Sequence, residues 1–143
     1  MIAYADTGFL VSLYGEDDLS ATATALAKPR PVFLLTALGE AEFTNAIELR
    51  AFRGQWTRRE ARAVRELFHQ HLGAGVFRLE DTGTEAWRVA MGLSRRYTAR
   101  FGSRTLDLLH VAAVLVLKPD AFLTFDERQR KVARAERVPL LPA

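Results

Sequence analysis

Short runs of consecutive apolar residues alternate with longer segments in which apolar residues recur every three or four positions. The apolar runs predict strands that are buried on both faces. They lie at residues 2–5, 32–35, 76–79 and 121–124, with a short final strand at 138–141. Strands that alternate with helices indicate an α/β fold: a mostly parallel central sheet of four to five strands, flanked by helices on both faces.

Start and stop signals define the helices between these strands. Thr57 and Glu60, for example, have the spacing of a capping box at the start of a helix. The predicted helices cover about residues 7–14, 18–28, 39–52, 57–72, 84–100, 105–117 and 127–136. No repeat or linker divides the 143 residues. We therefore expect one domain, residues 1–143, which is long enough to form a single hydrophobic core.

Composition excludes several classes of function. The absence of cysteine rules out disulfides, thiolate catalysis and Cys-ligated zinc, and it favours a reducing compartment. The first apolar run follows no basic residue and is interrupted by Asp6, unlike a signal peptide. The longest wholly apolar run, residues 111–117, is much shorter than the roughly 20 residues of a membrane span. These observations predict a cytoplasmic protein without a membrane span.

The net charge of +3 conceals an uneven distribution of charge. Residues 1–49 carry seven acidic and two basic side chains, whereas residues 50–143 carry ten acidic and 18 basic ones. Arginines recur on one face of the helix predicted at 57–72 and again between residues 88 and 104. They predict contacts with an RNA backbone, although solvated arginines on amphipathic helices give the same pattern. The arginines singled out for RNA contact are Arg58, Arg62, Arg65, Arg95, Arg96, Arg100 and Arg104.

Four acidic residues fall where an α/β fold binds its ligands, beyond the carboxyl ends of the strands. Asp6 directly follows the first strand, and Asp126 follows the fourth. Glu42 lies early in the helix after the second strand, and Asp107 begins the apolar helix that leads into the fourth. Each alone also fits a helix N-cap or a solvated helix position. Four carboxylates at one edge, however, would repel one another strongly without a cation.

Carboxylate oxygens, without cysteine or clustered histidine, select a hard ion such as Mg²⁺ or Mn²⁺. Such an ion, or a pair of ions, suits phosphodiester hydrolysis by an activated water. Glu40 competes with Glu42 for the second position, because the two point about 200° apart around a helix. His110, three residues after Asp107, can orient that carboxylate or pack in the core. The polar side chains that can support the acids are those of Thr7, Asn45, Thr124 and Gln129.

The sequence resembles PIN-domain ribonucleases, specifically the toxins of VapBC-type toxin-antitoxin pairs. The similarity rests on YADTGFLVSLY at residues 4–14, TALGEAEFTNAIELR at 36–50, RTLDLLHVAAVLVL at 104–117 and FLTFDERQRKVA at 122–133. These segments cover about a third of the chain and occur in the family's order.

The resemblance implies that Asp6, Glu42, Asp107 and Asp126 hold Mg²⁺ or Mn²⁺ and form the catalytic site. It favours Glu42 over Glu40, and it assigns supporting positions to Thr7, Asn45 and Thr124. The implied activity is endonucleolytic cleavage of RNA. The implied partners are a VapB-type antitoxin that blocks the site and a second copy of the chain, with higher assemblies formed together with the antitoxin.

Two other functions are compatible with parts of the sequence. A catalytically silent PIN-like module that only binds RNA or protein has no need to retain four acids. A receiver-like phosphoacceptor domain requires an acid pair after the first strand, where Asp6 stands alone. The acids therefore favour the nuclease.

Overall fold

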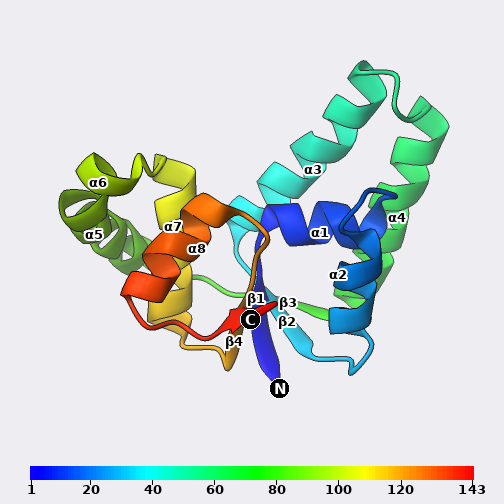
Figure 1. Ribbon diagram of the computed structural model, residues 1–143. Helices are drawn as coiled ribbons and strands as arrows, with labels where there is room; N and C mark the ends of the chain where they lie inside the picture. The colour runs from blue at the N-terminus through cyan, green and yellow to red at the C-terminus, as the bar shows by residue number, and fades with distance from the viewer.

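The computed structural model describes residues 1–143, and its strands form one central sheet (Figure 1). The strands are β1 (Ile2–Ala5), β2 (Val32–Leu35), β3 (Phe77–Leu79), β4 (Ala121–Leu123) and β5 (Leu140–Leu141). They are arranged in the order β3-β2-β1-β4-β5, and every neighbouring pair is parallel. The predicted α/β fold class is confirmed.

The helices follow the predicted positions with shifts of a few residues at their ends. They are α1 (Thr7–Tyr14), α2 (Ser20–Ala27), α3 (Ala37–Phe52), α4 (Arg58–Gly73), α5 (Gly83–Leu93), α6 (Ala99–Phe101), α7 (Thr105–Leu117) and α8 (Glu127–Ala135). The capping box at the start of α4 is confirmed, because Thr57 and Glu60 each accept a hydrogen bond from the other's backbone N–H. None of the helices combines the length and apolar character that crossing a membrane requires.

The helix predicted at 84–100 is present over residues 83–101 but is interrupted within its length. A π-helical turn, Ser94–Thr98, separates α5 from the short helix α6. The wider turn allows the rings of Tyr97 and Phe101 to stack at 5.6 Å between centroids, while the Tyr97 hydroxyl donates to Glu136 at 2.7 Å. The π-helical turn thus lies where Tyr97 contacts Glu136, the residue that follows α8.

The sheet separates two apolar cores, and alternate residues of each strand enter opposite ones. Ala3 and Ala5 of β1 pack with α1, α3 and α4, whereas Tyr4 packs with α5, α7 and α8. Figure 1 shows the corresponding layers, with α1 to α4 on one side of the sheet and α5 to α8 on the other. Both faces of the sheet are therefore covered, as its continuous apolar strands require.

The strand order reverses at β1, which lies between β2 and β4. Ala5 pairs with Leu123, and the Asp6 N–H donates to the Leu123 carbonyl at 3.1 Å. The carboxyl ends of β1 and β4 therefore lie next to each other at the point where the chain changes direction across the sheet. Open α/β sheets bind ligands at such a point.

Candidate functional site

Asp6 lies at the centre of the candidate site, directly after β1. Its carboxylate caps α1 by accepting from the Phe9 N–H at 2.7 Å, and it accepts from the Thr124 hydroxyl at 2.6 Å. The residue is 1% exposed. Burial raises the pKa of Asp6 to about 6, against the lowering effect of the two hydrogen bonds, and repulsion by Asp126 adds to the rise. Asp6 is both a helix cap and a destabilised buried charge.

Asp107 lies in the first turn of α7 and is paired with the arginine three residues before it. Arg104 Nε lies 3.0 Å from Asp107 Oδ2, and Arg104 Nη2 lies 3.3 Å from Asp107 Oδ1. Gln129 Nε2 donates to the same Oδ1 at 3.4 Å. Arg104 Nη2 also lies 3.9 Å from Asp126 Oδ2. The guanidinium of the chain itself therefore neutralises two of the four acids.

Glu42 extends from α3 toward the same edge, and two donors hold one of its oxygens. The Thr7 hydroxyl donates to Glu42 Oε1 at 3.0 Å, and His110 Nε2 lies 2.5 Å from that oxygen. Burial alone would raise the pKa of Glu42, but the hydrogen bonds from His110 and Thr7 hold it below its ordinary value. The structure therefore brings Glu42 to the site with a fixed orientation.

His110 connects Glu42 to the core through a buried relay. Its Nδ1 lies 2.9 Å from the Tyr4 hydroxyl, which lies 3.3 Å from the Thr36 hydroxyl. Burial raises the pKa of Tyr4, so the phenol stays protonated and keeps a hydroxyl hydrogen at this end of the relay. His110 is a core histidine, as one interpretation of the sequence held, but it orients Glu42 rather than Asp107.

Asp126 and its neighbours complete the edge after β4. Asp126 Oδ1 caps α8 by accepting from the N–H groups of Arg128 and Gln129 at 2.8 and 3.3 Å. The Thr124 hydroxyl accepts from the Asp126 N–H at 3.1 Å while it donates to Asp6. Capping and site formation are thus compatible for Asp126, as they are for Asp6.

The remaining predicted residues lie outside this network. Asn45 is exposed and bonds to none of the four acids, and Glu40 lines a separate surface depression with it. On α4, Arg62 pairs with Glu66 at 2.9 Å, and Arg65 forms an ion pair with Glu48.

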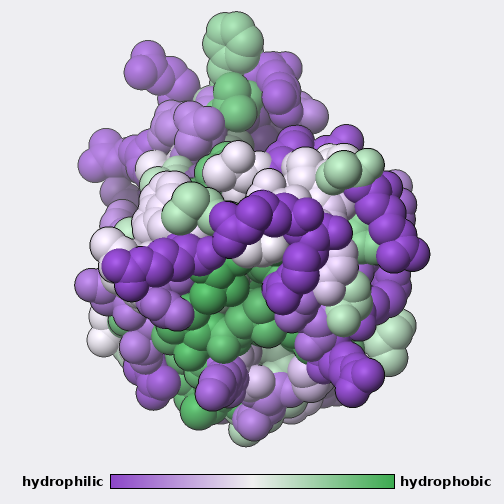
Figure 2. Space-filling model, turned by 90° about the vertical axis from the view of Figure 1, so that its left-hand side faces the viewer, coloured by the Kyte–Doolittle hydropathy of each residue, from purple (hydrophilic) through white to green (hydrophobic).

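Other predicted arginines lie on the face that carries α5 and α6. Arg95, Arg96 and Arg100 are exposed there, and Arg96 pairs with Glu136 at 3.0 Å. Figure 2 shows a belt of hydrophilic side chains across this face, above a hydrophobic area. Among the predicted arginines, Arg95 and Arg100 on this face and Arg58 on α4 are exposed and form no ion pair.

The donor chemistry of the four acids fits a hard divalent cation, since every group is a carboxylate. In this conformation, however, no three acidic or histidine side chains are gathered closely enough to hold a metal ion. The reason lies in the contacts: both Asp6 oxygens accept hydrogen bonds, one Glu42 oxygen faces His110, and both Asp107 oxygens face Arg104. The four carboxylates therefore have the chemistry that a divalent cation needs. In this conformation the guanidinium of Arg104 contacts Asp107 instead.

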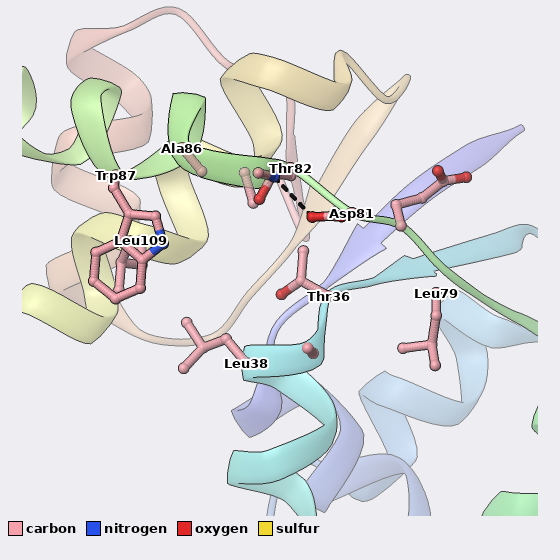
Figure 3. Close-up of a pocket in the computed structure, with 12 residues that line it drawn as sticks. Thr36, Leu38, Leu79, Asp81, Thr82, Ala86, Trp87 and Leu109 are labelled. Atoms are coloured by element: carbon pink, nitrogen blue, oxygen red, sulfur yellow. Dashed lines mark hydrogen bonds between the residues drawn. The ribbon is translucent and has the colours of Figure 1, made fainter.

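A separate cavity of about 400 Å³ lies between the first turn of α3, the β3–α5 connection, α5 and α7 (Figure 3). None of the four acids lines it. Its wall includes Thr36, the end of the buried relay, together with Leu38 and the half-exposed Trp87. Asp81 accepts from the Gly83 N–H at 2.8 Å at its rim, so this acid already serves the loop.

Comparisons with known proteins agree on one domain type. A sequence model of the PIN domain matches residues 3–135. No curated protein is significantly similar in sequence. Among solved structures, VapBC2 from Rickettsia felis bound to a promoter DNA fragment is similar with a TM-score of 0.67 and 14% identity, covering 98% of this chain and 97% of that one.

Two further solved structures share the fold. FitAcB from Neisseria gonorrhoeae has a TM-score of 0.65 and 16% identity, covering 98% of this chain and 96% of that one. VapBC-1 from nontypeable Haemophilus influenzae has a TM-score of 0.60 and 14% identity, with the same coverages.

Proposed function

Because this chain belongs to the PIN domain family, which its match over residues 3–135 establishes, we propose that it is a metal-dependent endoribonuclease and the toxin of a VapBC-type pair. The proposal is supported by Asp6 and Asp126, which follow β1 and β4 where these strands end side by side, and by Glu42 and Asp107, whose charges act on this edge from α3 and α7. Neither helix capping nor core packing explains all four positions.

In the proposed mechanism, Asp6, Glu42, Asp107 and Asp126 hold Mg²⁺ or Mn²⁺. A divalent ion there supplies Lewis acidity, which activates a water and stabilises charge on the attacked phosphate. The protein's own contribution is orientation: Thr124 holds Asp6, while Thr7 and His110 hold Glu42. Such outer contacts typically affect metal affinity or activity by about 10- to 100-fold.

The proposed substrate is RNA, bound by exposed arginines on the face of α5 and α6 and by Arg58 of α4. One proposed partner is a VapB-type antitoxin, because two of the similar structures are VapBC complexes. The other is a second copy of the chain, which the family resemblance implies. We infer a cytoplasmic site of action, where the RNA substrate is found.

The proposal is tested by incubating the purified chain with structured RNA in Mg²⁺ or Mn²⁺ and in EDTA. We expect cleavage only with metal, and a loss of about 10³-fold in Asp6→Asn, a loss comparable to that of a charge-stabilising group in an active site. Asp81→Asn is the matched control, because Asp81 caps a loop away from the site. Undiminished cleavage in EDTA would refute the metal mechanism, and RNA binding without cleavage would indicate a silent binding module.

A further inference from the structure

We propose that Arg104 is a displaceable counter-ion of the site: it neutralises Asp107 and Asp126 before metal binds and, once displaced by a divalent cation, binds a phosphate of the RNA. The inference rests on the proposed function and adds a positioning and substrate-binding residue to it. It is carried by the contacts, exposure and anchoring of this one side chain.

Arg104 forms direct contacts with the carboxylates of Asp107 and Asp126. Its Nε and Nη2 engage both oxygens of Asp107, at 3.0 and 3.3 Å, and Nη2 lies 3.9 Å from Asp126. The side chain of Asp107 is only 5% exposed. Asp107 raises the pKa of Arg104 most strongly, and the charges of Asp126 and Glu42 add to the rise. One guanidinium therefore contacts two of the four acids, Asp107 and Asp126.

The anchoring of Arg104 makes it displaceable. Its side chain is 62% exposed, and the only groups that it bonds are the site carboxylates. Arg130 is a contrasting arginine in the same region: its side chain is 8% exposed, and it donates to the carbonyls of Thr124 and Pro142 at 2.9 and 2.8 Å. Arg130 is built into the core, whereas Arg104 can leave the acids without disturbing any backbone hydrogen bond.

Competition with metal follows from the chemistry of the shared oxygens. The guanidinium fork occupies both Asp107 oxygens, which are the atoms that a divalent cation would coordinate. Binding of the ion therefore requires that Arg104 move away. A released guanidinium beside a phosphodiester has a planar fork that matches phosphate oxygens. The same residue thus serves the empty site and the substrate-bound site in turn.

The test measures Mn²⁺ affinity by calorimetry, without RNA, for the parent chain and three variants. In Arg104→Gln we expect Mn²⁺ to bind about three- to tenfold more tightly, because the ion no longer displaces a salt bridge. In Arg104→Lys, which keeps the charge but loses the fork, we expect an increase of about two- to threefold. Arg128→Gln is the matched control: it removes the same charge from an exposed side chain of α8 that bonds to no acid, and we expect less than a twofold change.

RNA affinity provides the second readout, measured in Ca²⁺ under conditions where gels show the RNA intact. We expect Arg104→Gln to bind RNA about tenfold more weakly, the effect of one charge-assisted hydrogen bond, and Arg128→Gln to lose less. Tighter Mn²⁺ binding together with weaker RNA binding supports both roles of Arg104. Thermal unfolding checks that each variant is folded; should Arg104→Gln not fold, Arg104→Lys decides the question by its Mn²⁺ affinity.

The outcomes separate this inference from the proposed function. Unchanged or weaker Mn²⁺ binding by folded Arg104→Gln overturns the counter-ion role, while metal-dependent cleavage by the parent chain leaves the nuclease intact. Absence of Mn²⁺ binding in both proteins overturns the nuclease and this inference together. Binding by Arg104→Gln alone supports the inference, because it shows that the guanidinium excludes the ion.

Discussion

The two sides of the acidic edge are held in different ways. On one side, Glu42 is bonded by Thr7 and His110, and His110 is backed by the buried hydroxyl of Tyr4. On the other side, Asp107 and Asp126 share the exposed guanidinium of Arg104. The first side is a hydrogen-bonded relay that reaches into the core. The second is a salt bridge at the surface.

The side of the site that carries Glu42 is the preorganised one. A buried hydrogen-bond relay is costly to disrupt, because each group left without a partner bears its full desolvation penalty. The guanidinium of Arg104 is exposed, so another cation can take its place at the buried carboxylate of Asp107. Glu42 is therefore ready for its ligand, whereas Asp107 becomes available only when Arg104 moves.

The largest expected effect on stability comes from removing His110 from the relay. His110→Phe leaves the hydroxyl of Tyr4 without its Nδ1 partner, and we expect the free energy of unfolding to fall by about 2–4 kcal/mol. Arg104→Gln, on the other side, should lower it by less, because the guanidinium is solvated and Gln129 still donates to Asp107. Urea denaturation of the metal-free proteins measures both values. Equal losses in the two variants would show that the two sides do not differ in rigidity.

Asp6, between the two sides, gives the metal-free protein a pH dependence. Its pKa in the folded state, about 6, lies above the ordinary value of 3.8. Below pH 4 the carboxyl is protonated in both states. Between pH 4 and 6 the unfolded chain releases the proton first, so the free energy of unfolding falls, by roughly 3 kcal/mol in all. Above pH 6 the loss is complete and constant.

Asp6→Asn isolates this contribution because it cannot titrate. Denaturation curves between pH 4 and 8 should show the parent losing stability relative to the variant as pH rises through 6. A constant difference between parent and variant over this range would mean that the buried carboxyl is not destabilised.

The contribution of a single donor to the orientation of Glu42 can be measured at Thr7. Thr7→Val eliminates the hydroxyl that donates to Glu42 Oε1, and we expect Mn²⁺ affinity to fall about tenfold, as for other groups that orient a ligand. Thr7→Ser retains the hydroxyl and should bind within about twofold of the parent. Calorimetric titration distinguishes the two. An equal loss in both would point to the methyl group and to packing rather than to orientation.

The smallest expected effect is on the salt dependence of RNA binding. It compares arginines outside the site that form ion pairs with arginines that form none. Arg62 and Arg65 pair with glutamates, whereas Arg95 and Arg100 form no ion pair. Replacing Arg95 and Arg100 by Ala should reduce the salt slope of RNA binding by about 1.4, at about 0.7 for each phosphate contact. Replacing Arg62 and Arg65 should reduce it by less than about 0.7. Binding isotherms in EDTA at several salt concentrations test this ranking.

The fold was predictable from the sequence because its strands are apolar runs and its helices carry local signals such as the capping box at Thr57. The same logic led from strand ends to Asp6 and Asp126. The choice between Glu42 and Glu40 followed from the family resemblance, and the structure brings Glu42, not Glu40, to His110 and Thr7.

Other features were not predictable because they depend on contacts between distant residues. Tyr4 reads as an ordinary core residue of a buried strand, and its partner His110 is 106 positions away. The contact of Arg104 with Asp107 had a local signal, the spacing of three residues in a helix start, but basic composition favoured RNA contact. The π-helical turn lies in a segment of helical periodicity, and its Tyr97 contacts Glu136, 39 positions away.

The central position of β1 has a consequence for the order in which the site forms during synthesis. β1 is made before the strands that pair with it, and its β4 side stays open until residues 121–123 are available. Asp126 and the Thr124 hydroxyl that holds Asp6 arrive at the same time. Pairings of such long sequence separation form late in folding. A growing chain therefore has an incomplete acidic edge until residues 121–126 have been translated.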